Sequence, residues 1–183
     1  MHFIQSNTRN TLSVSIWLLV LSVMAFFMII IGGLTRLTES GLSITDWKPI
    51  MGIIPPLTNQ AWIDAFNSYK ITPEFKVVNK MMDIAEFKFI YWWEWFHRFF
   101  ARCIGLVFIL PFLYFWFKNK ISKKLFLTLL LVFTFGVLQA FVGWWMVKSG
   151  LRDNPYVSAY RLTFHLTIAL FIFCILFWTT LTS

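Results

Sequence analysis

Four long apolar runs limit what this chain can fold into more than any other feature of its sequence. They cover residues 16–34, 99–117, 125–147 and 162–182. A helix that crosses the roughly 30 Å hydrocarbon core of a bilayer needs about 20 predominantly apolar residues, and each run has about that length. Charged residues make up only 13% of the chain, about half their usual share in soluble domains. We therefore predict an all-α membrane protein with a four-helix transmembrane bundle, and we exclude a soluble or a disordered chain.

The distribution of charge predicts the orientation of these spans. The loop at 118–124, between the second and third runs, holds four Lys and no acidic residue. Because short basic loops stay on the inner side of a membrane, we place this loop and both termini on the cytoplasmic or matrix side. The segment 35–97 is then exported, and it holds seven of the eight acidic residues. The net charge of +8 is thus interpreted as a topology signal, and no nucleic-acid partner is expected.

The exported segment carries helix signals of its own. After Asn59, which we predict as an N-cap, aromatic residues recur at i, i+4 and i+7 between residues 62 and 69. This spacing predicts a short amphipathic helix on the membrane surface or on top of the bundle. Asp83 and Glu86 have the spacing of a capping box. We therefore expect a helix that starts there and runs unbroken into the second span, which contains Pro111.

Two histidines mark the start of the second and fourth spans. His97 and His165 both lie at the predicted outer end of a helix that runs inward, so their imidazoles should reach a similar depth. Imidazoles on facing helices of a bundle commonly hold a haem iron. Arg98 follows His97, and Arg161 precedes His165 by one helical turn. These two arginines are candidate partners for haem propionates.

Glu94 precedes His97 by three residues and therefore shares its helix face. Two interpretations stay open for this carboxylate. It can form an i, i+4 ion pair with Arg98, or it can donate or accept a proton beside oxidation chemistry at a haem. The residues by themselves predict a haem-binding bundle and do not decide between these roles.

Other polar and small residues in the spans are interpreted as structural. Gly136, Ala140 and Gly143 form a small-residue stripe on the third span, which allows close helix approach. Gln139 lies beside it, and an amide within a span most often bonds across helices. Five tryptophans fit an aromatic belt at the outer interface: Trp92, Trp93, Trp95, Trp144 and Trp145.

Long stretches of the chain resemble one known family. They are GGLTRLTESGLSITDWKPIMGIIPP at 32–56, EFKFIYWWEWFHR at 86–98, QAFVGWWMVKSGL at 139–151 and VSAYRLTFHL at 157–166. In order and with these loop lengths, they are similar to the haem A synthases of the proteobacterial and mitochondrial type. The matched stretches cover most of the chain beyond the first span.

The resemblance implies a membrane oxidoreductase that oxidises the C8 methyl group of haem O to a formyl group, giving haem A for cytochrome oxidase. By the family pattern, His97 and His165 match the axial iron ligands of the half that binds haem O. Glu94 matches the carboxylate with the key catalytic role, and Arg98 and Arg161 stay the candidate haem-binding arginines. Members with a Cys pair in the first exported loop differ from this chain, which has none there.

The resemblance also implies a second half. Family members resemble two four-helix halves in tandem, whereas the 183 residues hold one; the haem B of the family is expected in the other half. The implied partners are haem O, the haem O synthase upstream, membrane lipid, and either a homo-oligomer or a second four-helix half. The implied location is the bacterial cytoplasmic membrane or the mitochondrial inner membrane.

Two alternatives use the same residues differently. A non-enzymatic b-type haem-binding or assembly module would store or pass on haem through the His pair without oxidising it. A transporter or a purely structural bundle would hold no haem at all. Extraction of haem from His97→Ala and His165→Ala variants separates these classes.

Overall fold

The computed structural model describes residues 2–46, 51–152 and 154–182, and in residues 2–11 and 51 only the backbone. Those residues form helices and connecting turns, with no strand among them. The elements in chain order are α1 (His2–Leu37), the short 3-10 helix η1 (Met51–Ile53), α2 (Asn59–Lys70), α3 (Pro73–Val77), α4 (Ile84–Phe117), α5 (Lys123–Gly150) and α6 (Ala159–Thr182).

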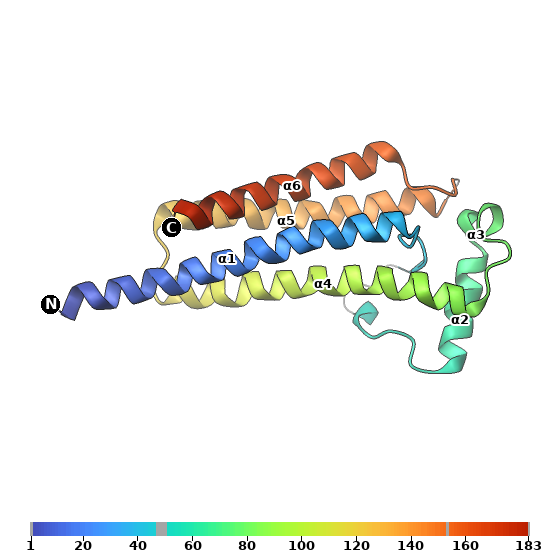
Figure 1. The fold of residues 1–183 in the computed structure, drawn as a ribbon, viewed down its shortest axis with the longest axis horizontal. Helices are drawn as coiled ribbons and strands as arrows, with labels where there is room; N and C mark the ends of the chain where they lie inside the picture. Colours follow the sequence, from blue (N-terminus) through green and yellow to red (C-terminus); the bar gives the residue numbers. More distant parts are fainter. Residues whose placement is uncertain (1, 47–50, 153, 183) are drawn as a thin grey trace.

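Four long helices, α1, α4, α5 and α6, lie side by side in an elongated bundle (Figure 1). Each is long and apolar enough to cross a membrane, so the four predicted spans are confirmed and the chain is an integral membrane protein. Helix α1 packs against both α4 and α6, and α5 packs against α6. The two ends of the chain lie at one end of the bundle (Figure 1). The other end carries η1, α2 and α3, which we call the cap.

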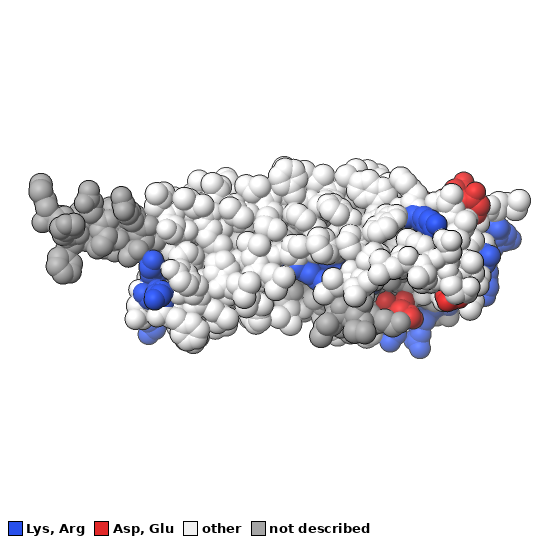
Figure 2. All heavy atoms as spheres, turned by 90° about the horizontal axis from the view of Figure 1, so that it is seen from below, with Lys and Arg blue, Asp and Glu red and all other residues white. Residues whose placement is uncertain are grey.

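Charged side chains lie mainly at the two ends of the bundle (Figure 2). On the face shown in Figure 2, blue side chains gather at both ends, and a broad white band, interrupted by one blue patch, lies between the ends. Acidic side chains are seen only at the cap end of this face (Figure 2). A band free of most charges is what a bilayer core requires of the surface that faces it.

Cys103 and Cys174 are free thiols, as expected for cysteines within apolar runs.

The start of α2 corrects one prediction. Thr58, not Asn59, is the N-cap: its hydroxyl accepts a hydrogen bond from the Ala61 N–H at 3.1 Å. Asn59 is the first residue of the helix. Either side chain can cap a helix, and the extended backbone of Thr58 is what places its oxygen over the first turn. The predicted aromatic face of α2 is confirmed, because Trp62, Phe66 and Tyr69 are buried against α4.

Helix α4 starts and continues as predicted. The Asp83 carboxylate accepts hydrogen bonds from the Ala85 and Glu86 N–H groups, both at 2.8 Å, and the Glu86 carboxylate accepts from the Asp83 N–H at 3.0 Å. This capping box opens a helix of 34 residues that joins the cap to the second span. The helix passes through Pro111 without ending.

The core of the bundle is built around the first span. Trp17 of α1 is buried among aromatic side chains of α4, with ring centroids 6.1 Å from Phe108 and 5.5 Å from Phe115. Its indole N–H donates a 2.8 Å hydrogen bond to the Val107 carbonyl. That carbonyl has no helical donor, because the residue four positions on is Pro111, which lacks an N–H. Trp17 therefore satisfies a backbone group that would otherwise be unpaired inside the membrane.

Candidate functional site

Glu94 is the best-connected polar side chain of the bundle. It lies on α4 with only 3% of its surface exposed. One carboxylate oxygen, Oε2, accepts hydrogen bonds from the Ser43 hydroxyl at 2.7 Å and from the Ile44 N–H at 2.8 Å. The other oxygen, Oε1, forms an ion pair of 2.5 Å with Arg98. Both oxygens are therefore bound by donors, as a buried carboxylate requires.

The loop after α1 contacts both Glu94 and Arg98. Ser43 is itself buried, and its hydroxyl also lies 3.2 Å from the Ser40 carbonyl. Arg98 donates a further 3.3 Å hydrogen bond to the Ile44 carbonyl. Glu94 and Arg98 thus hold both backbone groups of Ile44. Sequence reasoning anticipated the Glu94–Arg98 pair and missed Ser43 and Ile44, because a contact between a loop and a distant helix leaves no periodic signal.

The two imidazoles each lie against a glycine of a neighbouring helix. A Cβ atom added at Gly32 of α1 would lie 3.4 Å from Cε1 of His97, and one added at Gly143 of α5 would lie 3.0 Å from Cε1 of His165. The absence of a side chain at these positions makes room for the rings. The structure gives this meaning to Gly143, which the sequence suggested only as part of a helix-packing stripe.

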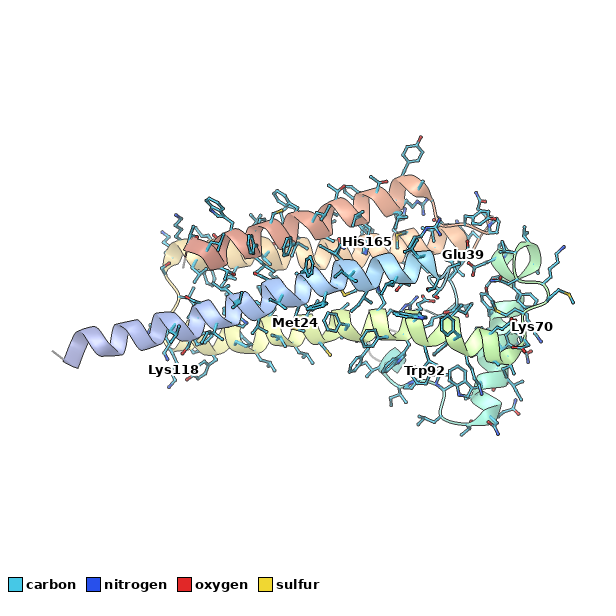
Figure 3. All side chains as sticks on the ribbon, viewed as in Figure 1. Met24, Glu39, Lys70, Trp92, Lys118 and His165 are labelled. Carbon is cyan, nitrogen blue, oxygen red and sulfur yellow. The ribbon has the colours of Figure 1, made fainter. Side chains whose placement is uncertain are left out.

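Each imidazole has a buried nitrogen that makes no hydrogen bond. Nδ1 of His97 and Nδ1 of His165 are buried without a hydrogen-bond partner. Nε2 of His165 lies 3.3 Å from the amide nitrogen of Gln139, and the Gln139 Oε1 atom is also buried without a partner. Buried polar atoms are nearly always paired, so a group of unpaired ones is consistent with a bound group that supplies their partners. Along the bundle, His165 lies between Met24 and Glu39, in the half that carries the cap (Figure 3).

The chemistry of the donor set suits haem. Among the described residues, no three His, Cys, Asp or Glu side chains come together as a cage for a bare metal ion. A haem iron needs only one or two axial ligands from the protein, since the porphyrin supplies the rest. Two imidazoles on different helices of one bundle fit that requirement.

Arg161 contacts Trp145 near the end of α5. Its Nη1 atom donates a 2.8 Å hydrogen bond to the Trp145 carbonyl, and its guanidinium carbon lies 4.2 Å from the centroid of the Trp145 ring. The structure thus joins Glu94 to Arg98, while Arg161 is held on the end of α5.

A second buried polar cluster lies in the cap and was not predicted. The Tyr69 hydroxyl donates a 2.9 Å hydrogen bond to Glu74, and the Asn79 amide donates a 2.7 Å hydrogen bond to the Tyr69 oxygen. Burial raises the pKa of Glu74 from 4.5 to about 7, and the negative charges of Glu94 and Glu39 add to the effect. Burial also raises the pKa of Tyr69. A single Glu in a short polar segment gives no sign of burial in the sequence.

Comparison with known proteins decides the family. Residues 15–183 match the COX15-CtaA family, described as cytochrome oxidase assembly protein. The chain belongs to the COX15-CtaA family. Membership covers all four spans, the cap and both histidines. No solved structure matches the chain significantly.

Curated relatives of this COX15-CtaA chain carry the name heme A synthase. The protein of Nitrosomonas eutropha is 50% identical over 171 residues, which is 93% of this chain and 48% of the relative. The Wolbachia protein from Brugia malayi is 51% identical over 168 residues, 92% of this chain and 50% of the relative. The Parvibaculum lavamentivorans protein is 47% identical over 178 residues, 97% and 52% respectively. The chain therefore spans about half the length of the curated relatives it matches.

Proposed function

We propose that this chain forms the haem O-binding half of a haem A synthase, the enzyme that oxidises the C8 methyl group of haem O to a formyl group by successive hydroxylations with loss of water. The observation that carries the proposal is the pair of imidazoles, His97 and His165, with buried unpaired nitrogens at the cap end of a COX15-CtaA bundle. The name shared by the relatives supports the reaction.

His97 and His165 would hold the haem O iron from α4 and α6. Haem O brings the iron and the methyl group that is oxidised; the chain positions them. Each ring is held by close packing against a glycine, so its orientation is fixed before the substrate binds. A neutral imidazole nitrogen without a hydrogen-bond partner is free to act as a ligand.

Glu94 would be the catalytic carboxylate in this proposal. It lies one helical turn from His97 on the same helix, and the Ser43 hydroxyl is in hydrogen-bond contact with it. This hydrogen bond would orient the carboxylate, since the Ser43 hydroxyl donates to it and otherwise contacts the backbone carbonyls of Ser40 and Ile90. Arg98 would keep the carboxylate in place and, with Arg161, pair with the haem propionates.

We further propose the membrane arrangement that follows from charge. The basic loop at 118–124 and both termini would lie on the cytoplasmic or matrix side, with the cap exported. The host membrane would be the bacterial cytoplasmic or the mitochondrial inner membrane. This bundle would be the first of two tandem halves, and haem B would belong to the second. A haem O synthase would supply the substrate, and the partner in the membrane would be the second half or another copy.

Haem extraction tests the proposal. The chain is expressed with its second half in a host that makes haem O and lacks haem A, and the haems are separated by chromatography. We expect haem A with the unchanged chain, and loss of bound haem O with His97→Ala or His165→Ala. The control is Gln60→Ala, on an exposed site of α2.

Two outcomes contradict the proposed enzyme, and a third contradicts the role given to Glu94. Haem content that is unchanged in both histidine variants favours a structural bundle or transporter. Stable haem with no formyl product, even with the second half present, favours the haem-binding module. Unchanged haem A in a Glu94→Ala variant removes Glu94 from the mechanism.

A further inference from the structure

A basic and aromatic pocket lies at the cap end of α5 and α6, and Arg161 is the candidate site residue that also lines it. Its volume is about 410 Å³. Three cationic side chains line it, Lys148, Arg152 and Arg161, together with the rings of Trp144 and Trp145. Among the lining residues that the structure describes, a set that leaves out residue 153, there is no acidic side chain.

The aromatic rings hold two of the cations in place. The Lys148 Nζ atom lies 4.8 Å from the centroid of the Trp144 ring, and the Arg161 guanidinium lies over the Trp145 ring. Cation–π contacts leave most of the N–H donors of Lys and Arg unused. Within the described part of the chain, no carboxylate pairs with Lys148 or Arg152. The pocket therefore offers positive charge and hydrogen-bond donors to an anion.

Lys148 lies on the side of α5 that points away from His165. Gln139 marks the side of α5 that contacts His165. Lys148 follows Gln139 by nine residues, or two and a half helical turns, and so lies on the opposite side of the helix. Phe141 precedes Lys148 by seven residues, which puts it on the same side as Lys148, and 58% of its surface is exposed. An anion bound by Lys148 therefore lies on this exposed side of α5.

An apolar surface continues from the pocket toward the middle of the membrane. Phe141, Val137 and Leu130 are all exposed on this side of α5. In a membrane-spanning helix such a surface is covered by acyl chains. Positive charge and tryptophan at the interface, above an apolar face, match a molecule with an anionic head and a hydrocarbon tail.

We propose that this pocket binds the headgroup phosphate of an anionic phospholipid, with one acyl chain along Leu130, Val137 and Phe141. Lys148 and Arg152 supply the charge that selects an anionic over a zwitterionic headgroup. The tryptophan rings fix the depth of the headgroup, as they do at membrane interfaces generally. The proposal rests on Lys148 and Arg152 and not on the proposed function, although Arg161 lines this pocket and is also a candidate haem-binding residue.

Lipid titration of the purified protein tests the site. Binding of phosphatidylglycerol and of phosphatidylcholine with the same acyl chains is measured by native mass spectrometry on the whole chain in detergent. We expect phosphatidylglycerol to bind at least about tenfold more tightly, and the double variant Lys148→Gln, Arg152→Gln to lose that preference. The matched control, Lys123→Gln with Lys124→Gln, removes the same charge at the other end of α5 and keeps the preference.

Further arms separate lipid from a free anion and from misfolding. Inorganic phosphate at millimolar concentration is expected to leave phosphatidylglycerol bound. A double variant that keeps the charges, Lys148→Arg with Arg152→Lys, is expected to retain the preference. The proposal is overturned if phosphate displaces the lipid, if the control pair loses the preference as the pocket pair does, or if the pocket pair has no effect.

Discussion

The Ser43 hydroxyl donates a 2.7 Å hydrogen bond to Glu94, 51 residues further along the chain. With the Ile44 N–H, it gives one carboxylate oxygen two donors from the loop that follows α1. Glu94 therefore has a structural role, because it binds this loop to α4, in addition to the catalytic role proposed for it. Loss of activity on substitution of Glu94 alone does not separate the two roles.

Ser43→Ala separates them. The change removes one hydrogen bond to the carboxylate and leaves Glu94, Arg98 and the Ile44 N–H in place, so we expect a loss of roughly 1.5–3 kcal/mol in the free energy of unfolding. Haem A formation should fall further than stability explains if Ser43 keeps the Glu94 carboxylate in its catalytic orientation. Ser68→Ala is the control, because that exposed hydroxyl bonds only within its own helix. Equal effects of the two changes on stability would contradict the structural role.

Gly143→Ala should weaken haem binding. The new Cβ atom would lie 3.0 Å from Cε1 of His165, which forces the ring or α5 to shift. Gly136→Ala is a matched control on the same helix, since its Cβ would meet nothing within 4 Å. Both changes favour the helix by about 1 kcal/mol. We expect at least a tenfold weaker haem titration, followed by absorbance, for Gly143→Ala only; equal affinities of the two variants would show that His165 does not bind the iron.

Trp17 and Pro111 should be energetically coupled. Trp17→Phe leaves the Val107 carbonyl unpaired, at a cost of about 1–3 kcal/mol. In a Pro111→Ala background residue 111 has its own N–H for that carbonyl, so Trp17→Phe should cost less there. A double-mutant cycle on the unfolding of the purified protein measures the difference. An additive cycle rules out this explanation, and Trp178→Phe at an exposed site of α6 serves as the control.

The cap should be more stable at acid pH. The pKa of Glu74 is raised by burial from 4.5 to about 7, so the folded cap binds this proton more tightly than the unfolded chain does. Its stabilising effect is complete below pH 4.5 and is lost as pH rises through 7, by about 3 kcal/mol at most.

Amide hydrogen exchange of α2 and α3, corrected for intrinsic rates, measures this dependence. We expect greater protection at pH 5 than at pH 8, and little pH dependence in Glu74→Gln. Asp64→Asn, on the exposed side of α2, should keep the dependence of the unchanged chain. Greater protection at pH 8 would mean that Glu74 is bound as a carboxylate in the cap.

The parts of the fold that follow from local sequence were predictable. Apolar length defines a span, and the Asp83–Glu86 spacing defines the start of α4, because each depends on neighbours in the chain. The buried Glu74 and the contact of Ser43 with Glu94 depend on how distant segments meet. The direction of the Arg161 side chain likewise depends on a contact between two helices, namely its packing over the Trp145 ring. Local pattern carries no information about these contacts.

The position of α1 between α4 and α6 has a consequence for assembly. Each helix that carries a candidate iron ligand, His97 or His165, packs against this one helix, which supplies Gly32 and no ligand. The relative position of the two imidazoles therefore depends on how α4 and α6 each pack against α1. Helix α6 is the last of the four to be synthesised, so α1 cannot pack against it before the whole bundle has been made. A haem that is bound by both imidazoles can therefore bind only after α6 has packed into the bundle.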